Sequence, residues 1–200
     1  MVEKFTIEDA KRLYGVDNWG AGYFDFSAQG NLLVLPTRDA TRTIDVRKVV
    51  DSLVGEGSSL PLLLRFPQIL SSQVRLLCEA FAHAVNEYDY QGAYRPVYPI
   101  KVNQQRPVVE EILKSGSRFH MGIEAGSKTE LLVALSMKLP STAYVVCNGF
   151  KDAEYIRLAL FGRALGRNIV VVVERRAELD LLLALARELK IRPIIVLRMR

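Results

Sequence analysis

The chain has 200 residues, half of them apolar, which is enough to form a full domain with a sizeable core. It contains no apolar run long enough to span a membrane, and its charged N-terminus lacks the apolar stretch of a secretory signal. The net charge is +5, but Lys and Arg are interspersed with Asp and Glu, so nucleic acid is not expected as the main partner. Cys78 and Cys147 lack the spacing of metal ligands, so the sequence predicts two buried thiols in a cytoplasmic protein and no metal ligands.

Residues 1–68 are predicted to form an N-terminal segment of mixed structure. Two extended runs, Tyr23–Phe26 and Leu32–Leu35, flank a Ser-Ala-Gln-Gly-Asn turn and predict a β-hairpin. The stretch "TIDVRKVVDSLVGEG" predicts a short amphipathic helix that closes at Gly55. The stretch "LPLLLRF" that follows predicts a strand.

Residues 69–200 are predicted to begin with a long amphipathic helix and to continue as a regular α/β repeat. The helix has apolar residues at helical spacing, namely Val74, Leu77, Cys78, Phe81 and Val85. Five apolar strands then alternate with helices, which predicts parallel strands with the helices packed outside them. The strands are "PVYPIK", "RFHMGIE", "AYVVCN", "NIVVVVE" and "PIIVLR", and the helices between them begin near Pro107, Ser127, Asp152 and Ala177.

Each of these strands ends in a polar residue: Lys101, Glu124, Asn148, Glu174 and Arg198. The carboxyl ends of successive parallel strands converge on one mouth, which is the active site in (β/α)8 barrels and the ligand crevice in open α/β sheets. Polar residues also end strands for purely structural reasons, because turn-forming side chains are common there. Most of these five side chains are long and charged, which favours a site.

Lys101 is the residue that most needs an explanation, because a lysine at the end of an apolar strand is rarely buried without a partner or a task. Strand alternation predicts that Val97, Pro99 and Lys101 point the same way, into the mouth. A desolvated lysine has a lowered pKa and is a nucleophile suited to a Schiff base. A structural ion pair with Glu124 on the neighbouring strand explains the residue equally well, and the residues alone leave both uses open.

The repeat is also too short for a closed barrel. A (β/α)8 TIM barrel needs eight strands, whereas five strand–helix units precede Arg200 and the last strand has no helix after it. An open edge at that point exposes unpaired backbone. The sequence therefore predicts a barrel truncated after about five strands, with these residues as the front part of a longer polypeptide.

Four stretches in fixed order resemble the pyridoxal-phosphate decarboxylases of the alanine-racemase-like barrel fold, PLP fold type III. They are "PIKVNQQRPVVEEIL", "GIEAGSKTELLVAL", "CNGFKDAEYIRLAL" and "VVVERRAELDLLLALARELKIRPIIVLRMR". Within that group they are similar to the biosynthetic arginine decarboxylases, as are "WGAGYFDF" and "LPLLLRFPQIL" upstream. The resemblance implies that residues 1–68 belong in part to the family's β domain and residues 69–200 to the first part of its PLP-binding barrel.

The resemblance also implies roles for individual residues. Lys101 would be the catalytic lysine that forms the Schiff base with pyridoxal 5'-phosphate. The other implied cofactor-binding residues are Asn103, Glu124, Asn148 and Arg198. Glu130 matches an acidic family position, but Ser127-Lys-Thr-Glu130 fits a capping box, which we expect to be its first duty. Glu174 is expected to be structural.

The implied reaction is decarboxylation of L-arginine to agmatine and CO2, a step of polyamine and spermidine biosynthesis, in a cytoplasmic homo-oligomer with shared active sites. A magnesium requirement is implied as well, for which this sequence offers no site. The phosphate-binding loop and the ring-nitrogen partner of the family come later than Arg200, so the 200 residues alone are expected to be inactive. Two alternatives stay open: another basic amino-acid decarboxylase or racemase on the same fold, and a non-catalytic module that binds an anion or a partner.

Overall fold

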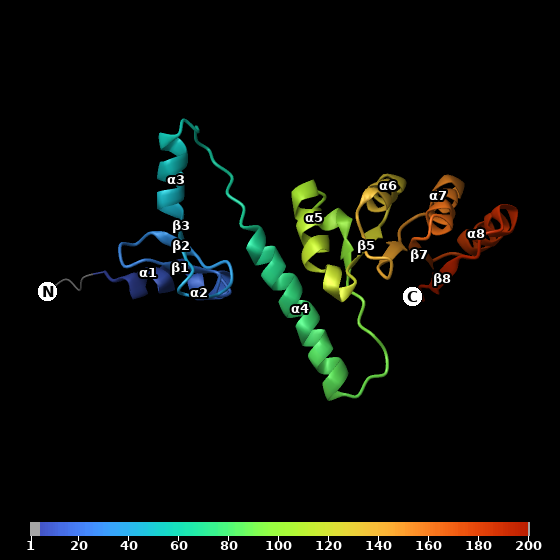
Figure 1. Ribbon diagram of the computed structural model, residues 1–200, viewed down its shortest axis with the longest axis horizontal. Coiled ribbons are helices and arrows are strands. Elements are labelled where there is room, and N and C mark those ends of the chain that lie inside the picture. The colour runs from blue at the N-terminus through green and yellow to red at the C-terminus, as the bar shows by residue number, and fades with distance from the viewer. Residues whose placement is uncertain (1–4, 200) are drawn as a thin grey trace. The chain divides into compact units, whose positions relative to one another are not determined.

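The computed structural model describes residues 5–199 and divides the chain into two compact units, one ending at Ser72 and one beginning at Gln73. Figure 1 shows the N-terminal unit in blue and cyan and the larger unit in green to red. The division falls within a single long helix, α4 (Pro67–Glu87). The two units are described separately below.

The first unit is built from short helices and a small antiparallel sheet. Helix α1 (Ile7–Tyr14) begins with a reciprocal cap between Thr6 and Asp9, and α2 (Val16–Trp19) follows directly. Strands β1 (Phe24–Phe26), β2 (Leu32–Val34) and β3 (Ile44–Asp45) pair in chain order. Helix α3 (Val46–Gly55) begins where the Asp45 carboxylate accepts the N–H groups of Arg47 and Lys48. The predicted hairpin and the predicted short helix are thus confirmed.

The strand predicted at "LPLLLRF" is wrong, because residues 61–66 have no regular secondary structure. Leu62 and Leu64 are half-buried while Leu63 between them is exposed, as in an extended chain. An extended segment becomes a strand only when its N–H and C=O groups pair with a neighbour. No strand among residues 5–199 pairs with this segment.

The predicted long helix is present as α4, although only part of its predicted apolar face is buried. In the second unit Val74 and Cys78 belong to the core, whereas Leu77 and Phe81 are about half exposed. The Phe81 ring stacks on Tyr94 with 4.0 Å between centroids. Helical periodicity therefore identified the helix correctly and overstated the width of its buried stripe.

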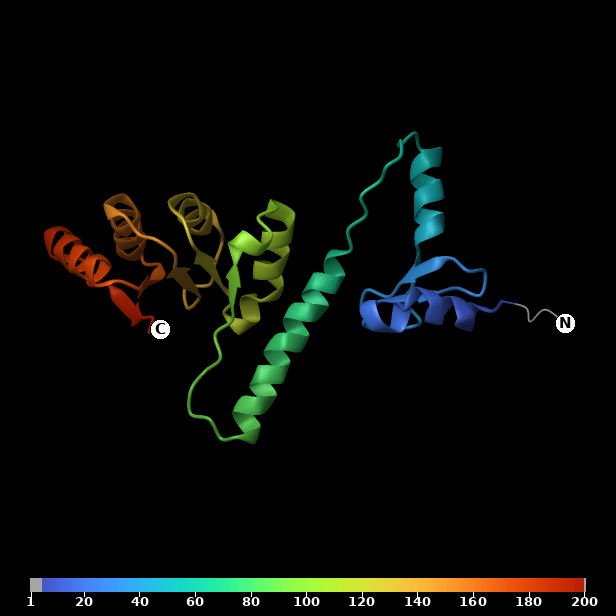
Figure 2. The ribbon, with the colours of Figure 1, turned by 180° about the vertical axis from the view of Figure 1, so that it is seen from behind.

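The second unit is a parallel sheet of five strands with helices between them, as predicted. The strands pair in chain order: β4 (Val97–Pro99), β5 (Gly122–Ala125), β6 (Tyr144–Cys147), β7 (Asn168–Val173) and β8 (Ile194–Leu197). The helices are α5 (Arg106–Ser115), α6 (Lys128–Ser136), α7 (Ala153–Ala164) and α8 (Arg176–Leu189), with 3₁₀ turns η1 (Ile100–Val102) and η2 (Ser117–Phe119). Figures 1 and 2 show α5 to α8 following one another along the sheet.

The two faces of this sheet differ in burial. Ile123, Val145 and Ile169 lie in register on neighbouring strands and are almost completely buried in the core shared with the helices. The opposite face is also mostly apolar, but Val170 and Val172, which are 8% and 9% exposed, and Val196 lie outside that core cluster. An apolar face without helices is the interior of a closed barrel, so the sheet is consistent with part of a (β/α)8 barrel.

Candidate active site

The strand-end residues lie at the carboxyl edge of the parallel sheet. Glu124 lies within β5 between two core residues, Ile123 and Ala125, so alternation turns it to the face away from the helices. Asn148 directly follows β6 and Glu174 directly follows β7, each after a residue that packs in the same core. A guanidinium nitrogen of Arg198, after β8, pairs with the Glu174 carboxylate at 3.2 Å. The fold thus brings these four residues to one edge and one face.

Lys101 reaches the same edge by a different route from the one predicted. Strand β4 ends at Pro99, and Lys101 lies in the turn η1, so strict strand alternation does not apply to it. Ile100, which is 2% exposed, anchors this turn in the core, and Lys101 is exposed. Its amine makes no ion pair with any carboxylate among residues 5–199. The structural alternative, an ion pair with Glu124, is therefore not formed, and the amine is left available.

The loop after Lys101 is held by its own polar groups. The Asn103 side-chain oxygen accepts the backbone N–H of Gln105 at 3.0 Å, and the Asn103 carbonyl accepts the Tyr98 hydroxyl at 3.1 Å. Gln104 donates to the Glu130 carboxylate at 3.3 Å, which joins this loop to the start of α6. Asn103 therefore has a structural duty of its own, and its cofactor contact stays a prediction.

The predicted capping box of α6 is formed in modified form. The Ser127 hydroxyl accepts the backbone N–H of Glu130 at 3.2 Å, as expected. The Glu130 carboxylate bonds back to the N–H of Gly126 at 2.7 Å, one residue earlier than in the standard box. Its first duty is thus at the helix start, as predicted.

The loop after β6 is fixed against the loop after β5. The N–H of Asn148 donates to Ala125 at 2.9 Å, and the Asn148 side-chain oxygen accepts the N–H of Gly149 at 3.0 Å. Gly149 has a φ of 72°, and a Cβ added there would lie 2.5 Å from the Gly126 carbonyl oxygen. Only glycine allows the two backbones to come this close.

Tyr155 also contacts the chain at the end of β5, where the loops after β5 and β6 meet. Its hydroxyl is buried and donates to the Ala125 carbonyl at 2.6 Å. Burial first, then the neighbouring Cys147 and the carboxylates of Glu130 and Glu124, raise the pKa of the Tyr155 phenol. The hydroxyl therefore stays protonated and remains a donor at any physiological pH.

Sequence reasoning missed two residues here, Lys151 and Glu178. Their side chains are 1% and 6% exposed, with 3.7 Å between the amine and the carboxylate. The Lys151 amine donates to the Gly149 carbonyl at 2.6 Å, and the Glu178 carboxylate accepts the N–H of Glu174 at 3.0 Å. The sequence carries one signal for Glu178: like Glu130, it lies in the first turn of a helix that follows a strand. The structure shows that each of these carboxylates accepts the backbone N–H four residues earlier.

Comparison with known proteins decides the family. The profile of the family described as "Pyridoxal-dependent decarboxylase, pyridoxal binding domain" matches residues 72–200. The chain belongs to the pyridoxal-dependent decarboxylase family. The predicted resemblance and the predicted PLP fold type III are thereby confirmed.

The similarity to curated relatives extends over nearly the whole length of this chain. It is 48% identical over 197 residues to the biosynthetic arginine decarboxylase of Rhodopirellula baltica, covering 98% of this chain and 29% of that protein. It is 45% identical over 196 residues to the protein of the same name from Deinococcus radiodurans, with the same coverage. The chain thus spans less than a third of the length of these curated relatives.

Solved structures agree with the fold of this chain. The biosynthetic arginine decarboxylase of Campylobacter jejuni matches with a TM-score of 0.80 and 33% identity, over 92% of this chain and 30% of that one. A diaminopimelate decarboxylase from M. jannaschi matches with a TM-score of 0.62 and 20% identity, over 90% and 36%. At that identity the second match supports the fold alone.

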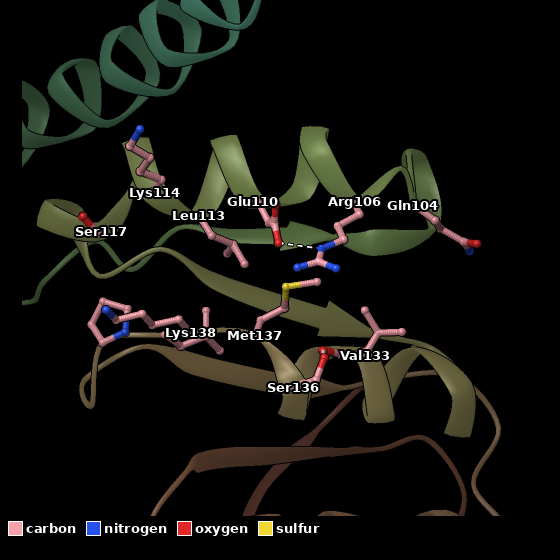
Figure 3. A pocket seen from close by; sticks show the side chains of 12 residues that line it. Gln104, Arg106, Glu110, Leu113, Lys114, Ser117, Val133, Ser136, Met137 and Lys138 are labelled. Carbon is pink, nitrogen blue, oxygen red and sulfur yellow. Dashed lines mark hydrogen bonds and ion pairs between the residues drawn. The ribbon is translucent and has the colours of Figure 1, made fainter.

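One sizeable cavity of this chain does not coincide with these site residues. It is a groove of about 1180 Å³ between α5 and α6, with an apolar floor that includes Leu113 and Met137. Figure 3 shows Arg106 and Glu110 paired on its α5 wall. A smaller pocket of about 170 Å³ lies at the carboxyl edge and is lined by Glu174 and Arg198 among others. The chemistry at the carboxyl edge, and not the size of the groove, identifies the candidate site.

Two requirements bear on the described part of the chain, those of a metal-ligand cluster and those of a membrane-spanning helix. Among residues 5–199, no three His, Cys, Asp or Glu side chains gather closely enough to hold a metal. In the same range, no helix combines the length and the apolar character needed to cross a bilayer.

Proposed function

We propose that this chain forms the cofactor-binding part of a decarboxylase that converts L-arginine to agmatine and CO2 with pyridoxal 5'-phosphate. The observation that carries the proposal is the combination of two facts. The chain is 45–48% identical to proteins named biosynthetic arginine decarboxylase, and an unpaired amine, Lys101, lies at the carboxyl edge of its sheet. When bound, the cofactor supplies an electron sink for the negative charge left at Cα as CO2 departs.

The residues at the carboxyl edge suit this group chemically. Lys101 would attach the aldehyde, because its amine is exposed and has no carboxylate partner among residues 5–199. Asn103 and Asn148 would offer amide groups, and Glu124 a carboxylate on the strand next to β4. Arg198, held by Glu174 at 3.2 Å, would supply a fixed positive charge. The buried amine of Lys151 is engaged with Gly149 and Glu178 and does not compete with Lys101.

The 200 residues alone are proposed to have little or no activity. They span 29% of the length of the curated relatives from R. baltica and D. radiodurans. The remaining cofactor contacts would come from two places. One is the part of the complete polypeptide that corresponds to the unmatched regions of those relatives, and the other is a second subunit of a homo-oligomer. A cytoplasmic location, a role in polyamine biosynthesis and a magnesium requirement belong to the same proposal.

The test uses the complete polypeptide that the gene encodes. Release of CO2 is measured for arginine, ornithine, lysine and diaminopimelate, and arginine is expected to be the best substrate. Borohydride reduction of the cofactor-loaded protein, followed by peptide mapping, should add the cofactor mass to Lys101, and Lys101→Met should abolish both the label and the activity. A protein that binds no cofactor, or carries the label on another lysine, would refute the proposal and favour a non-catalytic binding module.

The isolated 200 residues provide the second arm of the test. Little or no CO2 should be released, although the fragment contains Lys101. Turnover of arginine at the rate of the complete polypeptide would show that the proposed division of the site is wrong. If the complete polypeptide prefers another amino acid of the panel, the proposed reaction type stands and the proposed substrate is wrong.

A further inference from the structure

The buried pair Lys151–Glu178 has a geometry that its contribution to stability does not explain. Among residues 5–199, these are the only charged side chains that are almost completely buried. Charges removed from water lose their hydration, and a well-packed apolar pair of similar volume is often as stable or more stable in the same place. A pair selected for stability alone would also be expected to make its best contact within itself.

The best contacts of this pair are instead with the backbone. The amine and the carboxylate are 3.7 Å apart, longer than a hydrogen bond. The Lys151 amine lies 2.6 Å from the Gly149 carbonyl oxygen, and the Glu178 carboxylate lies 3.0 Å from the N–H of Glu174. Each side chain therefore holds one backbone group of a strand-end loop, and their mutual attraction holds the two loops together.

Both loops carry residues of the candidate site. The N–H of Gly149 holds the side-chain oxygen of Asn148 at 3.0 Å. The carboxylate of Glu174 holds the guanidinium of Arg198 at 3.2 Å. The pair thus links a candidate cofactor residue after β6, through the end of β7, to another after β8.

We propose that Lys151 and Glu178 are positioning residues that fix Asn148 and Arg198 for cofactor binding. This inference rests on the proposed function, because it assigns the pair a task at the same site. Neither side chain touches the cofactor in this scheme; both act through the backbone of Gly149 and Glu174. The expected consequence is that loss of the pair weakens cofactor binding without a matching loss of stability.

The test replaces both residues in the complete encoded polypeptide with apolar side chains of similar length, Lys151→Met together with Glu178→Leu. Thermal stability is expected to stay near that of the parent or to rise. The dissociation constant for pyridoxal 5'-phosphate, measured by titration of its visible absorbance, is expected to rise at least about tenfold, as is usual when residues that orient ligand-binding groups are lost. Glu178→Gln keeps an acceptor for the Glu174 N–H but removes the charge that attracts Lys151, so its dissociation constant should lie between those of the parent and the double variant.

A matched control removes an ion pair with no backbone contact to the site. Arg157 and Glu188 join α7 to α8 at 2.8 Å on the exposed helical layer. Arg157→Met with Glu188→Leu should leave cofactor affinity unchanged. This control shows whether the loss of any ion pair weakens cofactor binding, or only the loss of the Lys151–Glu178 pair.

The outcomes distinguish the inference from the function on which it rests. A double variant at positions 151 and 178 that folds and binds the cofactor as tightly as the parent overturns the positioning role. If that variant does not fold, Lys151→Met with Glu178→Gln replaces it, because this change leaves no unpaired buried charge and keeps an acceptor for the Glu174 N–H. Parental cofactor affinity in that folded variant has the same meaning. A parent polypeptide that binds no cofactor overturns the proposed function itself.

Discussion

Gly149 gives the sharpest stability prediction, because its backbone conformation and its surroundings both oppose a side chain. The change is Gly149→Ala, and the control is Gly166→Ala. Both glycines have positive φ, 72° and 83°, but a Cβ at Gly166 would meet nothing within 4 Å. At Gly149 the added Cβ would lie 2.5 Å from the Gly126 carbonyl oxygen. The pair therefore separates backbone strain from steric overlap.

The magnitudes follow from those two contributions. The left-handed conformation costs an alanine about 1–2 kcal/mol at either position. The overlap with Gly126 forces a backbone shift, and overpacking of this kind costs about 1–3 kcal/mol more. The entropy that alanine removes from the unfolded chain is the same for both variants and cancels in the difference. Gly149→Ala is therefore expected to be less stable than Gly166→Ala by about 1–3 kcal/mol.

The assay is urea denaturation of both variants and of the parent, with unfolding monitored by circular dichroism. Titration of the folded variants with cofactor should show weaker binding only for Gly149→Ala, because the backbone shift at that position displaces Asn148 or Gly126. Equal destabilisation of the two variants, or a larger effect at Gly166, would refute the close approach of the loops after β5 and β6.

The further predictions concern three single groups of the second unit. Tyr155→Phe removes the hydrogen bond to Ala125, whose carbonyl still accepts the N–H of Asn148, so the free energy of unfolding should fall by only about 0.5–1.5 kcal/mol in chemical denaturation. Burial raises the pKa of the Cys147 thiol from 9.0 to about 11, so the folded protein should resist iodoacetamide at Cys147 near neutral pH. Because the pKa of this thiol is raised on folding, its contribution to stability is complete below pH 9.0 and is lost as the pH rises to about 11. In Cys147→Ala the melting temperature should therefore fall less between pH 9.0 and about 11 than in the parent. The Lys128 amine first, and then the N–H of Tyr155, lower the pKa of Asp152 below 3.8; the stabilisation is therefore present above pH 3.8 and lost as the pH falls through the lower value, so Asp152→Asn should show a shallower acid transition than the parent.

The strand–helix alternation of residues 97–197 was predictable because each element has a local period. The strands are short apolar runs, the helices have caps such as Ser127 and Asp152, and both signals depend only on neighbours in the chain. The position of Glu124, Asn148 and Arg198 at one edge followed from the rule that parallel strands share a carboxyl edge. Family membership followed from motifs in fixed order.

Other features required knowledge of which segments lie side by side. "LPLLLRF" has the composition of a strand but no partner among the described strands, and the sequence does not show that. The turn at Lys101 depends on Ile100 packing in the core. The bond from Glu130 to Gly126, instead of Ser127, is a matter of local geometry that the capping pattern does not resolve.

The sequence by itself determined the order of the elements, the edge at which the polar residues gather and the family of the chain. Only the tertiary structure decided that Lys101 has no carboxylate partner among residues 5–199 while Lys151 is buried against Gly149 and Glu178. The physical reason is that periodicity and motifs report the local preferences of the chain. The burial and pairing of a charge depend on groups brought close by folding, and for Lys151 these include Glu178, in the first turn of the helix that follows the next strand.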